Sequence, residues 1–213
     1  MKRFATRVIY QVVGILLFAI GLVLTIRANI GYAPWEVFHS GLGIAIGISI
    51  GAASIIAGIV IVVIVTICGE KFGFGTIFSM IFTGVFLDAL LMLDIIPLAA
   101  NVFIGVAMLI AGMFVVSVGT YFYMKSAFGA GPRDNLMVVL NKKTKLPIGA
   151  CRGIVELTVT IIGWLLGGMV GIGTLITVLA IGFCIQIVFT AFKFDAASVE
   201  HETFAQTLKR LRI

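Results

Sequence analysis

The chain has 213 residues, of which 61% are hydrophobic and 11% are charged, and its formal net charge is +6. Soluble domains average roughly 45–50% apolar and about 25% charged residues, so this composition excludes a soluble domain, and its hydrophobicity also excludes a disordered chain. It predicts an integral membrane protein whose immediate surroundings are the lipid bilayer.

Apolar stretches of about 20 residues, the length that crosses roughly 30 Å of hydrocarbon, recur along the chain. They predict six transmembrane helices at about residues 6–27, 50–68, 75–94, 99–124, 147–167 and 174–193. The first stretch is longer than the apolar region of about 7–15 residues in a signal peptide, so we interpret it as an uncleaved span.

Two connections between these spans, one after the first span and one after the fourth, each contain a short helix that begins at a proline. Proline suits the first turn of a helix, and an acidic residue close behind it, here Glu36 or Asp134, interacts favourably with the helix dipole. The helices are expected over about 34–46 and 132–141, lengths of roughly 15–20 Å that are too short to span, so we interpret them as re-entrant or interfacial half-helices. The half-helix turns are Gly31, Pro34, Gly129, Gly131 and Pro132. Two interpretations stay open: these residues line a path or pocket, or they only turn the chain and cap the helices.

A gapless shift of 98 residues superimposes the second half of the sequence on the first. The matching pairs include Gly14 with Gly112, Gly21 with Gly119, Gly31 with Gly129, Pro34 with Pro132, Glu36 with Asp134, and Gly84 with Gly182. Because each copy holds three spans, the second copy enters the membrane from the opposite side. This predicts two inverted three-helix repeats, 1–98 and 99–193, an arrangement found in secondary transporters. A duplication without transport is the alternative.

The basic residues indicate the orientation of the spans. With both termini in the cytoplasm, 14 of the 15 Lys and Arg residues lie on the inner side and only Arg27 lies outside. They lie at chain ends and in short loops rather than along one soluble face, so we expect no nucleic-acid partner. Residues 194–213 are expected to form a cytoplasmic amphipathic tail at the membrane surface, with a partner-binding helix as the alternative.

Charged side chains inside spans are costly and are therefore candidates for function. Arg152 and Glu156 lie one turn apart on one face of the fifth span and are predicted to neutralise each other, either as a structural pair or within a substrate or proton site. The candidate pathway or substrate-binding residues are Glu36, Arg133, Asp134, Arg152 and Glu156, and the supporting residues are Arg27, His39, Asp88, Lys125 and Gln186. Asp88 and Gln186 are expected to face the interface between the repeats, and His39 either titrates near neutral pH or is structural.

The sequence lacks the motifs of the common soluble and membrane-bound enzymes. Cys68, Cys151 and Cys184 are isolated, which predicts neither a disulfide framework nor a zinc site. The nucleotide-binding, zinc-protease and serine-hydrolase motifs do not occur, so we expect no enzymatic activity, no cofactor and no metal.

The chain resembles a bacterial family, the YczE-like integral membrane proteins, which are grouped with YyaS and YitT, from Arg27 to about Phe189. The resemblance rests on Gly31-x-x-Pro34-Trp35-Glu36-Val37-x-His39, Gly129-Ala130-Gly131-Pro132-Arg133-Asp134, Arg152-x-x-x-Glu156 and two Gly-x-Gly-Thr turns. Glu36 stands where relatives often have Asp, a change that preserves the charge. The resemblance implies a six-span protein of the bacterial plasma membrane, and the family has no assigned substrate.

These observations favour a small-solute transporter or exporter whose unknown small-molecule substrate binds between the repeats. Two alternatives stay open: a non-transporting accessory protein of a biosynthetic or export complex, and the substrate-binding subunit of a multi-component uptake system. A homo-oligomer or a partner within a membrane complex is compatible with each of them.

Overall fold

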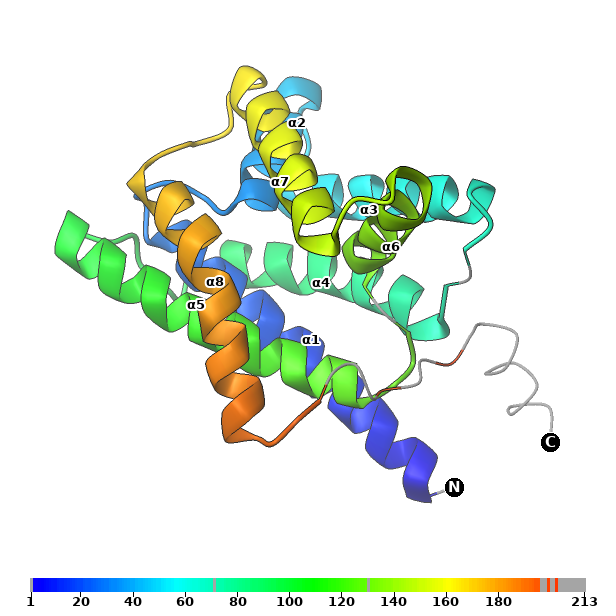
Figure 1. Ribbon diagram of the computed structural model, residues 1–213. Helices are drawn as coiled ribbons and strands as arrows, with labels where there is room; N and C mark the ends of the chain where they lie inside the picture. The colour runs from blue at the N-terminus through cyan, green and yellow to red at the C-terminus, as the bar shows by residue number, and fades with distance from the viewer. Residues whose placement is uncertain (1, 71, 130, 196–198, 200–201, 203–213) are drawn as a thin grey trace.

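The computed structural model describes residues 2–70, 72–129, 131–195, 199 and 202, and these residues form eight α-helices and no strand (Figure 1). The helices are α1 (Lys2–Arg27), α2 (Pro34–Ile46), α3 (Ile50–Ile67), α4 (Phe74–Leu93), α5 (Val102–Lys125), α6 (Pro132–Thr144), α7 (Ile148–Leu165) and α8 (Ile172–Ala191). The all-α class predicted from the sequence is confirmed. Most of the predicted amphipathic tail, 194–213, lies outside the described residues.

Five of the described helices, α1, α3, α4, α5 and α8, are long and apolar enough to cross a membrane. The fifth predicted span corresponds to α7, which meets the same criterion only when it is taken together with α6, from which it is bent by 115°. Of the six predicted spans, five are therefore supported by single helices. The remaining one is supported only if the bent pair of α6 and α7 forms one span.

The short helices α2 and α6 begin as the sequence predicts. Each starts with a proline in its first turn, after an extended residue, Ala33 in one case and Gly131 in the other. α2 ends at Ile46, followed by Gly47 in the left-handed conformation (φ 72°), where glycine is favoured. α6 continues to Thr144, three residues beyond the predicted end.

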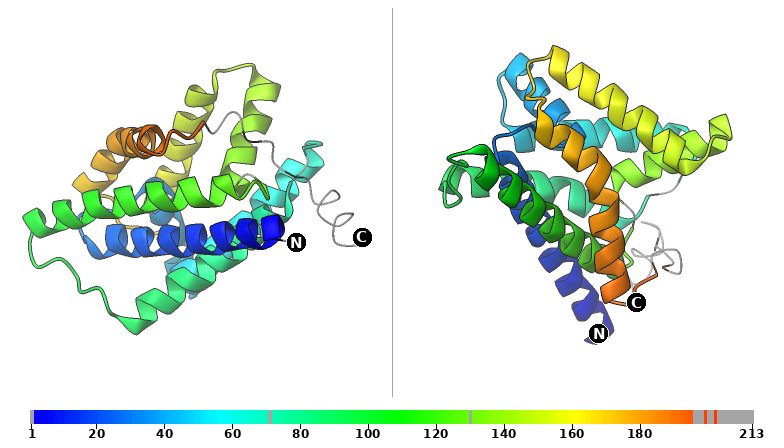
Figure 2. Two further views of the ribbon diagram at one scale, coloured as in Figure 1. Left: turned by 90° about the horizontal axis from the view of Figure 1, so that it is seen from below. Right: turned by 60° about the vertical axis from the view of Figure 1, so that its left-hand side comes forward.

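α1 and α5 pack side by side at the centre of the molecule, and α4 packs on α1 while α8 packs on α5 (Figure 2). Glycines allow the central pair to approach closely. A Cβ atom added to Gly14 would lie 2.9 Å from the carbonyl oxygen of Gly119, and one added to Gly21 would lie 2.8 Å from that of Gly112. Larger side chains at these positions would push the two helices apart.

The loops that precede α2 and α6 are each anchored to the opposite half of the chain. The N–H of Gly75 in α4 donates to the carbonyl of Phe128 at 2.9 Å, and the N–H of Gly173 in α8 donates to that of Ile30 at 2.7 Å. Gly31 follows Ile30 with φ 111°, and a Cβ there would lie 2.5 Å from the backbone nitrogen of Gly171. These hydrogen bonds fix where the two short helices start.

The helix boundaries follow the sequence repeat. α6, α7 and α8 begin and end 98 residues after α2, α3 and α4, and α5 ends 98 residues after α1. The left-handed residues in the loops also correspond, Gly31 with Gly129 and Gly69 with Gly167.

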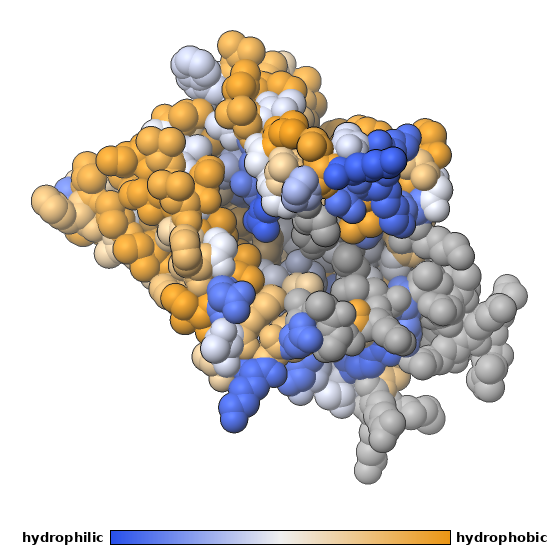
Figure 3. Space-filling view, in the orientation of Figure 1, coloured by the Kyte–Doolittle hydropathy of each residue, from blue (hydrophilic) through white to orange (hydrophobic). Residues whose placement is uncertain are grey.

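Much of the surface is apolar. Figure 3 shows hydrophobic surface over α5 and α8, and hydrophilic groups near the end of α6. On α8 the side chains of Leu175, Leu179 and Phe183 are exposed by 65–73%. Apolar surface of this extent is typical of helices that face lipid.

Candidate functional site

A partly open cavity of about 240 Å³ is lined by residues from all eight described helices. Both short helices present their first turns to it, through Pro34–Glu36 and Pro132–Arg133. Its volume is below the roughly 300–1,000 Å³ of pockets that hold drug-sized ligands, so it suits a small solute. Figure 3 shows a hollow in the middle of the surface, with hydrophilic atoms between apolar helices.

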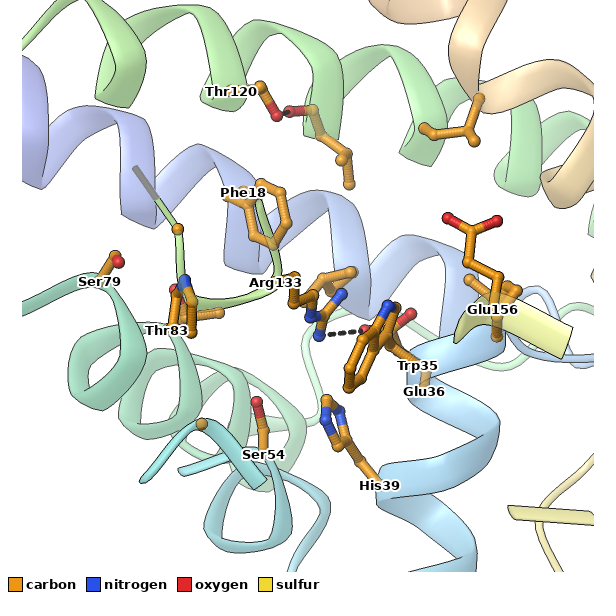
Figure 4. Close-up of a pocket in the computed structure, with 18 of the residues that line it drawn as sticks. Phe18, Trp35, Glu36, His39, Ser54, Ser79, Thr83, Thr120, Arg133 and Glu156 are labelled. Atoms are coloured by element: carbon orange, nitrogen blue, oxygen red, sulfur yellow. Dashed lines mark hydrogen bonds and ion pairs between the residues drawn. The ribbon is translucent and has the colours of Figure 1, made fainter. Parts of the chain in front are cut away.

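Glu36 and Arg133 meet in this cavity, although they belong to opposite halves of the chain. The Glu36 side chain is only 3% exposed, and its Oε1 atom lies 3.4 Å from Nη2 of Arg133, whose side chain is 31% exposed. The Arg133 guanidinium also stacks over the Trp35 ring at 4.6 Å from its centroid (Figure 4). The cation is therefore held by a carboxylate and an aromatic face together.

His39 lies one turn beyond Trp35 on α2 and also lines the cavity. Its side chain is buried, and no described residue forms a hydrogen bond with its Nδ1 atom. A buried imidazole nitrogen without a partner is costly, so it offers a hydrogen bond to any ligand that reaches it. Figure 4 shows the ring close to Trp35 and Ser54.

Arg152 and Glu156 form the ion pair that their spacing on α7 predicts. Nε of Arg152 lies 2.8 Å from Oε1 of Glu156, with side-chain exposures of 48% and 15%. Both residues line the cavity. Glu156 also lies close enough to Glu36 for the two carboxylates to interact electrostatically.

Four of the five candidate pathway residues therefore share one cavity, and their role in function stays a prediction. The side chain of the fifth, Asp134, lies outside the described residues. Among the turn residues, Pro34, Gly131 and Pro132 line the cavity, whereas Gly31 packs against Gly171. Gly129 packs against Gly73.

The supporting residues other than His39 lie away from the cavity. Arg27 pairs with Asp94 at 2.5 Å and joins the end of α1 to the end of α4. Lys125 donates to the hydroxyl of Tyr121 at 2.7 Å.

Asp88 and Gln186 have hydrogen-bond partners within their own halves of the chain, and their expected position at the interface between the repeats stays a prediction. Asp88 accepts hydrogen bonds from the N–H of Gly51 at 2.8 Å and the hydroxyl of Ser49 at 2.5 Å, so it caps α3 within its own half. Gln186 is exposed and lies 3.4 Å from Thr190 on its own helix. Each group finds a local partner, which satisfies it without a contact across the interface.

The sequence reasoning missed most of the cavity wall, including Trp35 and the hydroxyls of Thr120 and Thr177. Trp35 stands next to Glu36 in the first of the two repeated Gly-Pro motifs, and this position was the available signal. Thr120 donates to the Val116 carbonyl and Thr177 to the Gly173 carbonyl, each at 2.8 Å. Because a threonine satisfies itself within its helix in this way, its position in an apolar span does not reveal a polar site. Among the described residues, no three His, Cys, Asp or Glu side chains gather in a way that could hold a metal ion.

Comparison with known proteins identifies several relatives. An uncharacterized protein of Haemophilus influenzae is 30% identical over 182 residues, which cover 83% of this chain and 83% of that protein. The uncharacterized membrane protein YczE of Bacillus subtilis is 30% identical over 179 residues, or 81% of this chain and 80% of its own length. The uncharacterized protein YyaS of the same organism is 25% identical over 181 residues, or 84% and 90%. No solved structure matches.

The apolar helices and the similarity to a protein named as a membrane protein together support a multi-pass membrane protein. The resemblance to YczE-like proteins is confirmed by these relatives. A family model described as "Family of unknown function (DUF6198)" matches residues 5–190, and the chain belongs to this family.

Proposed function

We propose that this protein is a small-solute transporter of the bacterial plasma membrane, built from two inverted-topology repeats, with its substrate site in the cavity between them. Support comes from the lining residues, many of which are related by the shift of 98 residues. The related pairs include Ile15 with Met113, Phe18 with Val116, Leu22 with Thr120, Ser79 with Thr177, and Met80 with Val178. Trp35 and Arg133 are equivalent positions too, and they stack on each other. Equivalent residues meet where a two-fold axis passes, which favours a site on the axis between the repeats.

The proposed orientation has both termini in the cytoplasm, as the distribution of Lys and Arg favours. In that orientation the start of α3 and the end of α4 face outward, and the start of α7 and the end of α8 face the cytoplasm.

One observation carries the transport proposal: the two equivalent helix pairs around the cavity are packed differently. α3 packs along α4, whereas its counterpart α7 makes at most marginal contact with α8. In the proposed orientation the cavity is closed toward the outside and open toward the cytoplasm.

Glycines show the difference at the level of single atoms. A Cβ on Gly51 would lie 2.2 Å from the carbonyl oxygen of Gly84, and one on Gly84 would lie 2.6 Å from that of Gly51. The equivalent glycines, Gly149 and Gly182, have no atom of the described neighbouring residues within 4 Å of such a Cβ. Glycine inside a helix costs about 1 kcal/mol relative to alanine, and close packing offsets that cost only in the first pair.

We infer that glycine occurs at positions 149 and 182 because the protein adopts a second conformation in which these positions are closely packed. In it, α7 and α8 close through Gly149 and Gly182, while α3 and α4 separate, and the cavity opens to the other side. Gln186, the counterpart of Asp88, becomes able to accept the N–H of Gly149 as Asp88 accepts that of Gly51. Exchange between two such packings is alternating access.

The test is solute release from vesicles that contain the purified full-length protein. The vesicles are loaded with a mixture of amino acids, organic amines and organic acids, and mass spectrometry follows the loss of each solute. A double variant, Arg152→Gln with Glu156→Gln, removes the cavity pair without leaving an unpaired charge. Glu70→Gln is the matched control, because Glu70 pairs with Lys142 outside the cavity.

We expect wild type and the Glu70→Gln control to release at least one solute class at least ten times faster than protein-free vesicles do. The double variant should release it at the background rate. Equal release from wild-type and protein-free vesicles would show that the protein does not transport these solutes.

A further inference from the structure

The positive and negative side chains in the cavity are equal in number among the described residues, and this limits the net charge of a solute that binds there. Among the described side chains, the cavity presents two carboxylates, Glu36 and Glu156, and two guanidinium groups, Arg133 and Arg152. His39 is buried close to Arg133, where a further positive charge would be repelled. A solute with a single net charge would leave that charge without a counter-charge among groups that already compensate each other, which is costly where the site is partly shielded from water. A zwitterion adds no net charge.

Both ion pairs retain capacity for a ligand. Arg133 has five N–H donors, and its contact with Glu36 at 3.4 Å is a long one. A ligand carboxylate suits these donors because a guanidinium binds carboxylates in a bidentate manner. Glu156 contacts Arg152 through its Oε1 atom, and the Arg152 side chain is half exposed, so a ligand ammonium group can compete for this carboxylate.

The rest of the wall suits a small apolar group. Phe18, Ile61 and Met80 line the cavity together with the charged residues. The Nδ1 atom of His39, which has no hydrogen-bond partner among the described residues, offers one further hydrogen bond. A volume of about 240 Å³ limits the ligand to a small molecule.

We infer that the solute is a small amino carboxylate, with its carboxylate on Arg133 and its ammonium group on Glu156. That this ligand is also transported rests on the proposed function. The binding of the ligand to the cavity is a separate claim, and a binding experiment tests it.

The probes share one carbon skeleton and differ only in charge: L-leucine as the zwitterion, 3-methylbutylamine as the cation and 4-methylpentanoate as the anion. Glycine, L-proline and trimethylglycine extend the zwitterionic set. Binding is measured on the purified full-length protein by titration calorimetry and by the shift in melting temperature, since a ligand of the folded state raises it.

At least one zwitterion should bind at least ten times more tightly than the amine and the acid of the leucine skeleton. Glu156→Gln should lower the affinity for that zwitterion at least tenfold. It should leave the affinity for the acid unchanged or raise it, because Arg152 is then released from its partner. Glu70→Gln should change neither affinity. A purely structural role for Glu156 would lower all affinities together.

The inference is overturned if the amine or the acid binds as tightly as every zwitterion, or if no zwitterion binds. In either case, release of another solute class in the vesicle experiment would leave the transport proposal intact. Conversely, zwitterion binding without release of any solute would refute transport while the assignment of the cavity would stand.

Discussion

Glu36 and Arg133 illustrate how a buried charge is tolerated in this protein. The carboxylate is almost fully enclosed, and the stacked guanidinium is its only ion-pair partner among the described residues. Each group therefore compensates the other, and removal of one leaves a charge without compensation in a poorly solvated site. The shift of 98 residues places Trp35 opposite Arg133, so two short helices with the same start carry different side chains that complement each other.

Removing one partner of this pair should cost more stability than removing both. Glu36→Gln leaves Arg133 without its carboxylate and is expected to destabilise the protein by about 1–3 kcal/mol. Adding Arg133→Gln should recover part of that loss, because no unpaired charge remains. A double-mutant cycle on thermal unfolding in detergent measures this coupling. Additive losses would mean that the 3.4 Å contact contributes nothing.

At the scale of elements, α7 and α8 are packed differently from their equivalents, α3 and α4. α2 and α7 pack closely, since a Cβ on Gly41 would lie 2.2 Å from the carbonyl oxygen of Gly163. α8 packs instead on α5. A change in which α7 approaches α8 therefore moves α2 with α7, and with them Glu36 and Glu156.

The substitutions Gly149→Ala and Gly182→Ala should raise the stability of the protein and lower its rate of transport. In the described conformation no described atom obstructs the new methyl groups, so Gly182→Ala, in the middle of α8, should stabilise its helix by roughly 0.5–1 kcal/mol, and Gly149→Ala, in the first turn of α7, by less. Closure of α7 on α8 should be obstructed, because the equivalent Cβ at Gly51 would lie 2.2 Å from a carbonyl oxygen. We expect a higher melting temperature and at least tenfold slower solute release from vesicles. Unchanged release would refute the role of these glycines in closure.

At the scale of the whole molecule, the sequence predicts the order and bounds of the helices well, because span length, proline starts and the repeat are local signals. It does not distinguish cavity residues from other charged ones. Arg27 and Lys125 are equivalent positions that look as suitable as Arg133, yet both lie at helix ends and find partners there. The sequence also does not predict that α7 and α8 are separated, since in our proposal the same sequence allows both the separated and the closed packing of these helices.

The central claim is that α7 and α8 close on each other in a second conformation, and disulfide cross-linking tests it most directly. Glu156→Cys and Val178→Cys, the counterparts of Gly58 and Met80 under the shift of 98 residues, are introduced together in a protein whose Cys68, Cys151 and Cys184 are replaced by alanine. Gly149 and Gly182 are kept, because side chains there would obstruct the closure. The control pair is Gly58→Cys with Met80→Cys, because a Cβ on Gly58 lies 3.6 Å from that of Met80, within the range for a disulfide.

Both pairs are oxidised in native membranes, and the cross-linked fraction is followed on gels. The account predicts that both pairs cross-link: the control pair in the described conformation, and the α7–α8 pair in the second conformation, where it comes into the equivalent contact. Cross-linking of the control pair alone, with none between positions 156 and 178, would contradict the account.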